Sequence, residues 1–158
     1  MKICVSVQAE TTAAAKRLLE GAYRQGDAVE LRLDGMRDPD LPGLMAEKKG
    51  KLVVTNRRRE EGGAFFGPEA ERVGRLEDAA ILGADYVDIE AATDPALIQA
   101  LKDRIAARGN RTKIILSWHD FRGTPSARTL KAKLREMRSL GADVIKIVTF
   151  ARKREDNL

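Results

Sequence analysis

Lys146 is the residue of this sequence whose position most clearly suggests chemistry. It lies within the apolar run Val144–Val148, where burial of an unpaired ammonium group is costly. Burial of that kind favours the neutral amine, which is the form that attacks a carbonyl carbon. The alternative interpretation is a lysine that reaches solvent or pairs with a carboxylate such as Glu90. Lys146 is therefore a candidate nucleophile.

His119 is the only histidine of the chain and ends a second apolar segment that begins at Lys113. An imidazole can remove a proton and return it near neutral pH, so His119 is a candidate general base and acid. Asp88 or Glu90, earlier in the chain, could fix the orientation of its ring. A purely structural histidine is the alternative. We expect no metal site, because one histidine and the distant Cys4 do not make a usual zinc ligand set.

Two arginines, Arg32 and Arg57, are candidates for holding an anionic substrate, because a guanidinium group and a carboxylate are matched for paired hydrogen bonds. Internal salt bridges with Glu30 and Asp88 are the alternative, and the sequence leaves both interpretations open. The charged run at residues 58–61, directly after Arg57, is expected to be a solvated loop.

These residues need elements that bring them together, and the chain alternates short β-branched runs with segments of helical apolar spacing. Strands are predicted at residues 2–7, 29–34, 51–56, 86–90, 113–119 and 144–150. Helices are predicted at residues 12–24, 41–48, 68–82, 95–108 and 126–140. This alternation predicts βαβ units and a parallel sheet.

Side chains alternate between the two faces of a strand, and this alternation sorts the charged residues onto one face. Glu30 and Arg32 share one face and Leu31 lies on the other, and the later strands follow the same rule. In a (β/α)-barrel the apolar face packs on the helices, and polar residues near the carboxyl ends of the strands line the active-site mouth. The pattern therefore predicts that Lys146 and His119 point inward.

The glycine pattern argues against the common nucleotide-binding folds. A dinucleotide fold carries G-x-G-x-x-G after its first strand, but residues 8–12 contain no glycine. The sequence also contains no P-loop motif. The predicted fold class is therefore α/β, of the (β/α)8 TIM-barrel family, with about six of the eight β/α units present.

Composition sets further limits on function. Of 158 residues, 43% are hydrophobic and 34% charged, and no apolar run approaches the roughly 20 residues that cross a bilayer. Cys4 is the only cysteine, so we predict a buried, inert thiol and no disulfide. With 4% aromatic residues, platforms for stacking nucleic-acid bases are scarce despite a net charge of +5. We expect a cytoplasmic protein with a small anionic substrate and no nucleic-acid or membrane partner.

Several segments, taken together and in order, resemble the type I 3-dehydroquinate dehydratases. They are Glu30–Asp34, Val54–Arg57 with Glu61–Gly63, Tyr86–Glu90, Ser117–Phe121 with Thr124-Pro125, and Asp143–Ile147. Each segment is a weak signal alone, but the set spans nearly the whole chain. A Schiff-base aldolase of the same architecture would share Lys146 but would not explain Ser117–Phe121 or Glu61–Gly63.

The resemblance implies dehydration of 3-dehydroquinate to 3-dehydroshikimate and water in the shikimate pathway, through a lysine Schiff base and without a cofactor. Lys146 matches the family lysine that forms an imine with the substrate ketone. His119 matches the residue that removes the neighbouring proton and assists departure of the hydroxyl group, and Glu90 matches its carboxylate partner. The expected substrate-binding residues are Ser6, Glu30, Arg32 and Arg57.

The expected barrel is incomplete, because a full (β/α)-barrel has eight strands and typically about 250 residues. We expect residues 1–158 to form a single, incomplete barrel domain without the last two strands of the family. Open strand edges expose unpaired backbone groups. We therefore expect a homodimer or another assembly that covers the open edge, and a catalytically inactive fragment or interaction module is the alternative.

Overall fold

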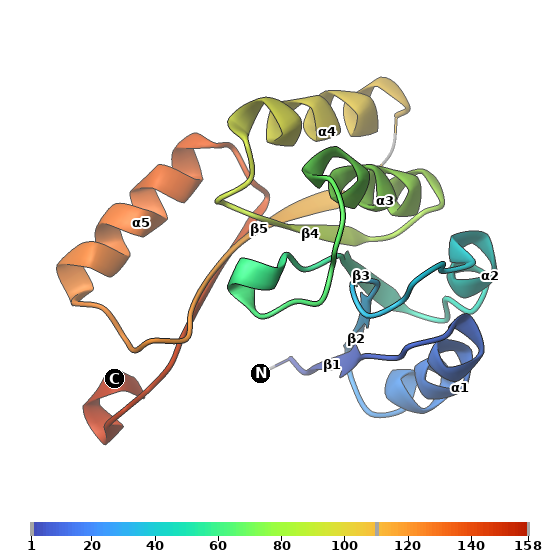
Figure 1. The fold of residues 1–158 in the computed structure, drawn as a ribbon, viewed down its shortest axis with the longest axis horizontal. Coiled ribbons are helices and arrows are strands. Elements are labelled where there is room, and N and C mark those ends of the chain that lie inside the picture. Colours follow the sequence, from blue (N-terminus) through green and yellow to red (C-terminus); the bar gives the residue numbers. More distant parts are fainter. Residues whose placement is uncertain (1, 110, 158) are drawn as a thin grey trace.

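The computed structural model describes residues 2–109 and 111–157, and strands alternate with helices along the chain as predicted (Figure 1). The strands are β1 (Cys4–Val7), β2 (Ala28–Arg32), β3 (Lys51–Thr55), β4 (Tyr86–Glu90), β5 (Lys113–Asp120) and β6 (Val144–Thr149). The helices are α1 (Thr12–Tyr23), α2 (Leu41–Met45), α3 (Glu69–Ile81), α4 (Pro95–Ala107) and α5 (Ala127–Ser139), with 3-10 turns η1 (Arg59–Glu61) and η2 (Arg154–Asn157).

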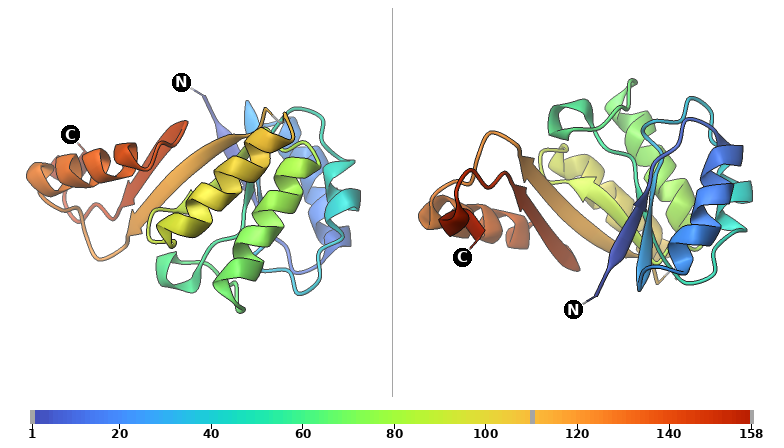
Figure 2. Two further views of the ribbon diagram at one scale, coloured as in Figure 1. Left: turned by 90° about the horizontal axis from the view of Figure 1, so that it is seen from above. Right: turned by 90° about the horizontal axis from the view of Figure 1, so that it is seen from below.

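The described strands form one parallel sheet in the order β1-β2-β3-β4-β5-β6, and each strand pairs with the next one in the chain. The sheet curls, and α1, α3 and α4 lie along its convex side (Figure 2). Within the described residues, β1 and β6 each have one paired edge and one unpaired edge. A curled parallel sheet wrapped by helices is a partial (β/α)-barrel, which confirms the predicted fold class.

Local signals set the limits of the helices. The hydroxyl groups of Thr11 and Ser126 cap α1 and α5, accepting hydrogen bonds from the backbone nitrogens of Ala14 and Thr129 at 3.2 and 3.3 Å. α3 is followed by Gly83, whose φ of 94° is a conformation that glycine adopts without a steric penalty. No helix among residues 2–109 and 111–157 combines the length and the apolar character needed to cross a bilayer.

The hydrophobic core lies between the sheet and the helices. Leu31, Val54 and Val87, from β2, β3 and β4, are fully buried in one cluster with Leu19 of α1 and Leu76 of α3. Full burial of an aliphatic side chain of this size stabilises the fold by about 1.5–3 kcal/mol. This layer fixes one face of each strand and leaves the other face for polar side chains.

Cys4 contradicts the prediction of a buried thiol, because it is exposed. β1 is the first strand of the sheet, so the face that carries Cys4 and Ser6 is covered on one flank only, whereas Val7 on the opposite face is buried. Partial burial raises the pKa of Cys4, and the carboxylate of Glu30 adds to the increase. The sequence pattern identified the strand but not its position at the edge.

Candidate active site

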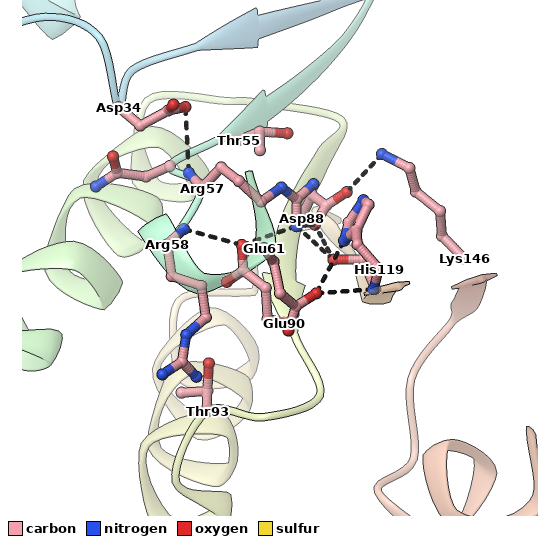
Figure 3. A network of polar contacts seen from close by, with 12 residues as sticks. Asp34, Thr55, Arg57, Arg58, Glu61, Asp88, Glu90, Thr93, His119 and Lys146 are labelled. Carbon is pink, nitrogen blue, oxygen red and sulfur yellow. Dashed lines mark hydrogen bonds and ion pairs between the residues drawn. The ribbon is translucent and has the colours of Figure 1, made fainter. Parts of the chain in front are cut away.

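Polar side chains from the strands meet on the concave face of the sheet, as the alternation predicted (Figure 3). On one side, Ser6 of β1 donates a hydrogen bond to one oxygen of Glu30 at 2.8 Å, and Thr55 of β3 donates to the other oxygen at 2.8 Å. Glu30 is thereby held between β1 and β3 on this face of the sheet. Two residues expected to bind substrate, Ser6 and Glu30, are in direct contact.

Lys146 reaches this face from β6. Its amine lies 3.2 Å from an oxygen of Asp88 on β4 and 3.7 Å from an oxygen of Glu30, and its side chain is 36% exposed. The ion-pair alternative considered for this lysine is therefore present, with Asp88 in place of Glu90. An amine that is tethered by carboxylates and still accessible can be approached by a small molecule from the open side of the sheet.

Asp88 is the fully buried centre of the group. Its carboxylate accepts a hydrogen bond from Ser117 at 2.6 Å and lies 3.0 Å from the guanidinium of Arg57. Burial alone would raise the pKa of Asp88, but the charges of Arg57 and Lys146 outweigh burial and hold that pKa below its usual value. Asp88 is therefore a carboxylate at neutral pH and anchors the amine of Lys146.

His119 lies near the end of β5 on the same face as Ser117, and its carboxylate partner is Glu61. An oxygen of Glu61 lies 2.9 Å from Nδ1 of the ring and also accepts the backbone N–H of His119 at 2.9 Å. Both side chains are 7% exposed. A carboxylate accepts hydrogen bonds, so this contact favours the neutral tautomer with the proton on Nδ1 and the lone pair on Nε2. This arrangement gives His119 a nitrogen that can act as a base.

The expected pairing of His119 with Glu90 is corrected by this geometry. Glu61, which was expected in a solvated loop, lies in η1 and is buried. Glu90 instead contacts Arg57 at 2.8 Å and forms a short ion pair with Arg72. Glu90 is directed from β4 to Arg57 and Arg72. Strand order alone could not reveal where the loop that carries Glu61 folds.

Glu90 is buried between two guanidinium groups. Burial raises its pKa above the usual value of a glutamate, although the charges of Arg72 and Arg57 act in the opposite direction. The backbone N–H of Arg58 also lies 3.3 Å from one of its oxygens. Glu90 therefore fixes the positions of arginines and of the loop that begins at Arg58.

Arg72 is a site residue that the sequence interpretation missed. It lies on α3, its side chain is fully buried, and it also donates to Glu69 and Thr93 at 2.8 Å each. The available signal was its spacing, since Arg72 falls four residues before the buried Leu76 on the core face of the helix. A charged residue on such a face needs a buried partner, and Glu90 is that partner.

Both arginines expected to bind substrate are engaged in ion pairs. Arg57 donates to Glu90 at 2.8 Å and to Ser117 at 2.6 Å. Arg32 donates through two nitrogens to the two oxygens of Asp34, at 2.7 Å each. The internal salt bridge between Arg57 and Asp88 that the sequence left open is therefore present, with Glu90 as a second partner of Arg57. Arg32 pairs with Asp34 instead of Glu30. These contacts orient the guanidinium groups on the concave face.

Asp34 links β2 to the loop that carries Glu61. Besides Arg32, it accepts the backbone N–H groups of Arg57 at 3.2 Å and Ala64 at 2.9 Å. The loop between β3 and α3 is thereby held over the carboxyl end of the sheet.

Among the described residues, no cluster of His, Cys, Asp and Glu side chains has an arrangement suited to a metal ion.

Comparison with known proteins identifies one family. The family model described as type I 3-dehydroquinase matches residues 3–158. The 3-dehydroquinate dehydratase of Desulfotalea psychrophila is 34% identical over 157 residues, which cover 98% of this chain and 67% of that protein. The 3-dehydroquinate dehydratase of Thermococcus gammatolerans is 38% identical over 145 residues, which cover 92% of this chain and 64% of that protein.

Solved structures agree with the sequence comparison. The crystal structure of 3-dehydroquinate dehydratase from Geobacillus kaustophilus superposes with a TM-score of 0.88 at 28% sequence identity. The match covers 98% of this chain and 64% of that one. The chain thus spans about two thirds of the length of the relatives that it matches.

Proposed function

Because the chain belongs to the type I 3-dehydroquinase family, we propose that it acts as a 3-dehydroquinate dehydratase, a hydro-lyase that converts 3-dehydroquinate to 3-dehydroshikimate and water. The observation that carries the proposal is the pairing of β5 with β6. Ser117 lies opposite Lys146 and His119 lies opposite Val148, so an amine and an imidazole share the concave face two residues apart in register.

The first chemical step belongs to Lys146. After the ammonium group has released a proton to solvent, the amine attacks the ketone carbon of the substrate, and loss of water gives an imine. Asp88, 3.2 Å from the amine, accepts its hydrogen bond and directs it towards the concave face. The protonated imine withdraws electrons and makes the adjacent C–H acidic. Attack by water at the end of the cycle releases the product and restores the amine.

The second step belongs to His119. With its Nδ1 proton directed to Glu61, the Nε2 lone pair can accept the proton of the adjacent carbon. The imidazolium then donates a proton to the departing hydroxyl group, which leaves as water. His119 thereby returns to the protonation state in which it began. Glu61 stabilises the imidazolium that forms between the two transfers.

Four residues are proposed to bind the substrate: Ser6, Glu30, Arg32 and Arg57. Glu30 lies 3.7 Å from the amine of Lys146, and its contacts with Ser6 and Thr55 hold it there for a substrate hydroxyl group. The guanidinium groups of Arg32 and Arg57 supply positive charge for an anionic substrate, and their acidic partners orient them. Glu90, in this proposal, positions Arg57 instead of His119.

Trapping of the imine tests the proposal. The protein is mixed with 3-dehydroquinate, borohydride is added, and the intact mass and the modified peptide are measured. We expect a reduced adduct on Lys146, its absence in Lys146→Met, and an adduct without turnover in His119→Asn. Lys153→Met, an exposed lysine of the same chain, is the matched control and should give the wild-type adduct. No adduct from folded protein would refute the dehydratase activity of this chain.

The open edges of the sheet support a second element of the proposal. We propose that residues 1–158 form one incomplete barrel domain and that a homodimer or another assembly covers the unpaired edges of β1 and β6. β6 contains no buried residue, whereas four of the five residues of β4 are buried. Unpaired edges of this kind favour association.

A cytoplasmic location is proposed from the expected role in aromatic amino acid biosynthesis.

A further inference from the structure

Phe121 lies directly after β5 and packs against the candidate base. Its ring is stacked on the imidazole of His119, with 5.9 Å between ring centroids and 25° between ring planes. Phe121 lies in the turn that follows β5, two residues after His119. An aromatic ring therefore packs beside the imidazole in a stacked orientation.

The same phenylalanine ring lies against Gly62, the residue after Glu61. A Cβ atom at Gly62 would come within 2.8 Å of Cε2 of Phe121, which is closer than packed atoms approach. Gly62 also has a φ of 79°, a conformation suited to glycine. Phe121 thus contacts the two segments, β5 and η1, that contribute His119 and Glu61.

Burial in the core does not explain this position. Phe121 is 53% exposed, so the apolar area that it removes from water is much smaller than that of a core phenylalanine. Phe65, for comparison, is 7% exposed on the neighbouring loop. An exposed aromatic ring that lies beside His119 and against the residue after Glu61 is placed to influence the hydrogen bond between those two side chains.

We propose that Phe121 is a positioning residue for His119: it holds the imidazole plane so that Nδ1 stays directed to Glu61 and Nε2 stays free, and Gly62 is required for its approach. The stacked phenylalanine ring limits rotation about the bond that joins the imidazole to the chain. It also shields the hydrogen bond between His119 and Glu61 from water on that side. The catalytic consequence of this role rests on the proposed dehydratase function.

Because His119 is the only histidine, nitrogen NMR of protein labelled with 15N-histidine reports on this ring alone. In the wild type we expect the neutral tautomer with the proton on Nδ1. In Phe121→Ala we expect signals of both tautomers, and in Phe121→Tyr we expect the wild-type signal to return. An unchanged tautomer in folded Phe121→Ala would overturn the proposal without any reference to activity.

Kinetics give the second measurement. Stacking contacts of this kind correspond to about 3- to 10-fold in rate, so Phe121→Ala should lower kcat by about that factor with little change in KM. Borohydride trapping on Lys146 should be unchanged, because imine formation does not use His119. A rise in KM alone, or a loss of trapping, would instead identify Phe121 as a substrate contact and contradict the positioning role.

A double-mutant cycle tests the contact with Gly62. Gly62→Ala should disturb the tautomer and kcat, and its effect should be smaller when Phe121→Ala is also present, because the close contact is then absent. Gly83→Ala is the matched control: Gly83 has a φ of 94°, but a Cβ there meets no atom within 4 Å. Additive effects of Gly62→Ala and Phe121→Ala would refute the coupling.

The two proposals fail in distinguishable ways. If the wild type forms no imine and no product, the dehydratase function fails, while the tautomer measurement still decides the role of Phe121. If the wild type is active and Phe121→Ala keeps both the wild-type tautomer and the wild-type kcat, only the positioning role fails.

Discussion

A histidine acts as a base through one ring nitrogen, and in this chain Glu61 determines which nitrogen that is. The Glu61 carboxylate accepts both the backbone N–H and the Nδ1–H of His119, so a single side chain fixes the backbone and the ring together. Its burial removes competing water from the contact. The proton transfer assigned to His119 therefore depends on Glu61 as much as on the imidazole.

Replacement of Glu61 tests this dependence. Glu61→Gln should lower kcat by about 10²-fold or more, because proton transfer by a correctly placed base contributes about 10²- to 10⁴-fold. The imine on Lys146 should still be trapped. Glu60→Gln is the matched control, since the adjacent Glu60 side chain is 71% exposed and contacts Arg58 instead of His119. Equal rates for the two variants, measured by product absorbance, would show that Glu61 has no part in the reaction.

Glu90 has a different role from Glu61. It lies between Arg57 and Arg72, and all three side chains are nearly or fully buried. Buried charge clusters of this kind contribute little net stability compared with an apolar core, but loss of one member leaves an unpaired charge. The cluster therefore serves to hold Arg57 and the loop from Arg58 in one arrangement.

At the scale of elements, the loop between β3 and α3 decides whether the site forms. This loop carries Glu61 and Gly62, and Asp34 of the preceding β-α unit ties it to β2 through the N–H groups of Arg57 and Ala64. The paired contact with Arg32 orients the Asp34 carboxylate for these bonds. Asp34 thus connects the end of β2, the end of β3 and the loop that carries Glu61.

The charge of Asp34 predicts a dependence of stability on pH. Burial would raise the pKa of Asp34, but hydrogen bonds and the charge of Arg32 outweigh burial and hold the pKa below its usual value of 3.8. A folded-state pKa below the unfolded value adds stability above about pH 4. That contribution is lost as the pH falls through the folded-state pKa.

Asp34→Asn should therefore be less stable than the wild type at pH 7, by about 1.5–3 kcal/mol, the usual range for a hydrogen bond to a charged group. The difference should shrink as the pH falls below about 4. Urea unfolding at a series of pH values measures both effects. Asp38→Asn, at an exposed aspartate nearby, is the matched control. A difference that stays constant down to pH 2 would contradict the assigned ion pair.

At the scale of the whole molecule, the distribution of burial follows the position of each strand in the sheet. β2, β3 and β4 supply most of the fully buried strand residues, while β1 and β6 have unpaired edges within the described residues. Lys146 lies on β6, so the candidate nucleophile belongs to one of the two strands whose side chains are least buried. Closure of the edge would stabilise the strand that carries the amine.

Hydrogen exchange measured at several protein concentrations tests this closure. If an assembly covers the edges, backbone amides of β1 and β6 should become more protected as concentration rises, and β4 should stay protected throughout. Light scattering should then give at least twice the 17.4 kDa mass of one chain. A 17.4 kDa particle with exchange independent of concentration would refute the assembly.

The sequence by itself determined the order of the elements and the face on which each strand carries its charges. Both are local properties, since the period of the apolar pattern distinguishes strand from helix and alternation assigns each side chain to a face. For this reason the predictions that His119 and Lys146 turn inward needed no tertiary information. Family motifs along the chain then identified the family that the comparisons confirm.

Only the tertiary structure decided which of these charged side chains contact each other. The pairing of His119 with Glu61, the burial of Arg72 against Glu90 and the exposure of Cys4 depend on how a loop folds, how a helix packs and which strand lies at an edge. These are contacts between segments far apart in the chain. The free energy of such contacts comes from packing and desolvation in the assembled fold, and no local pattern carries that information.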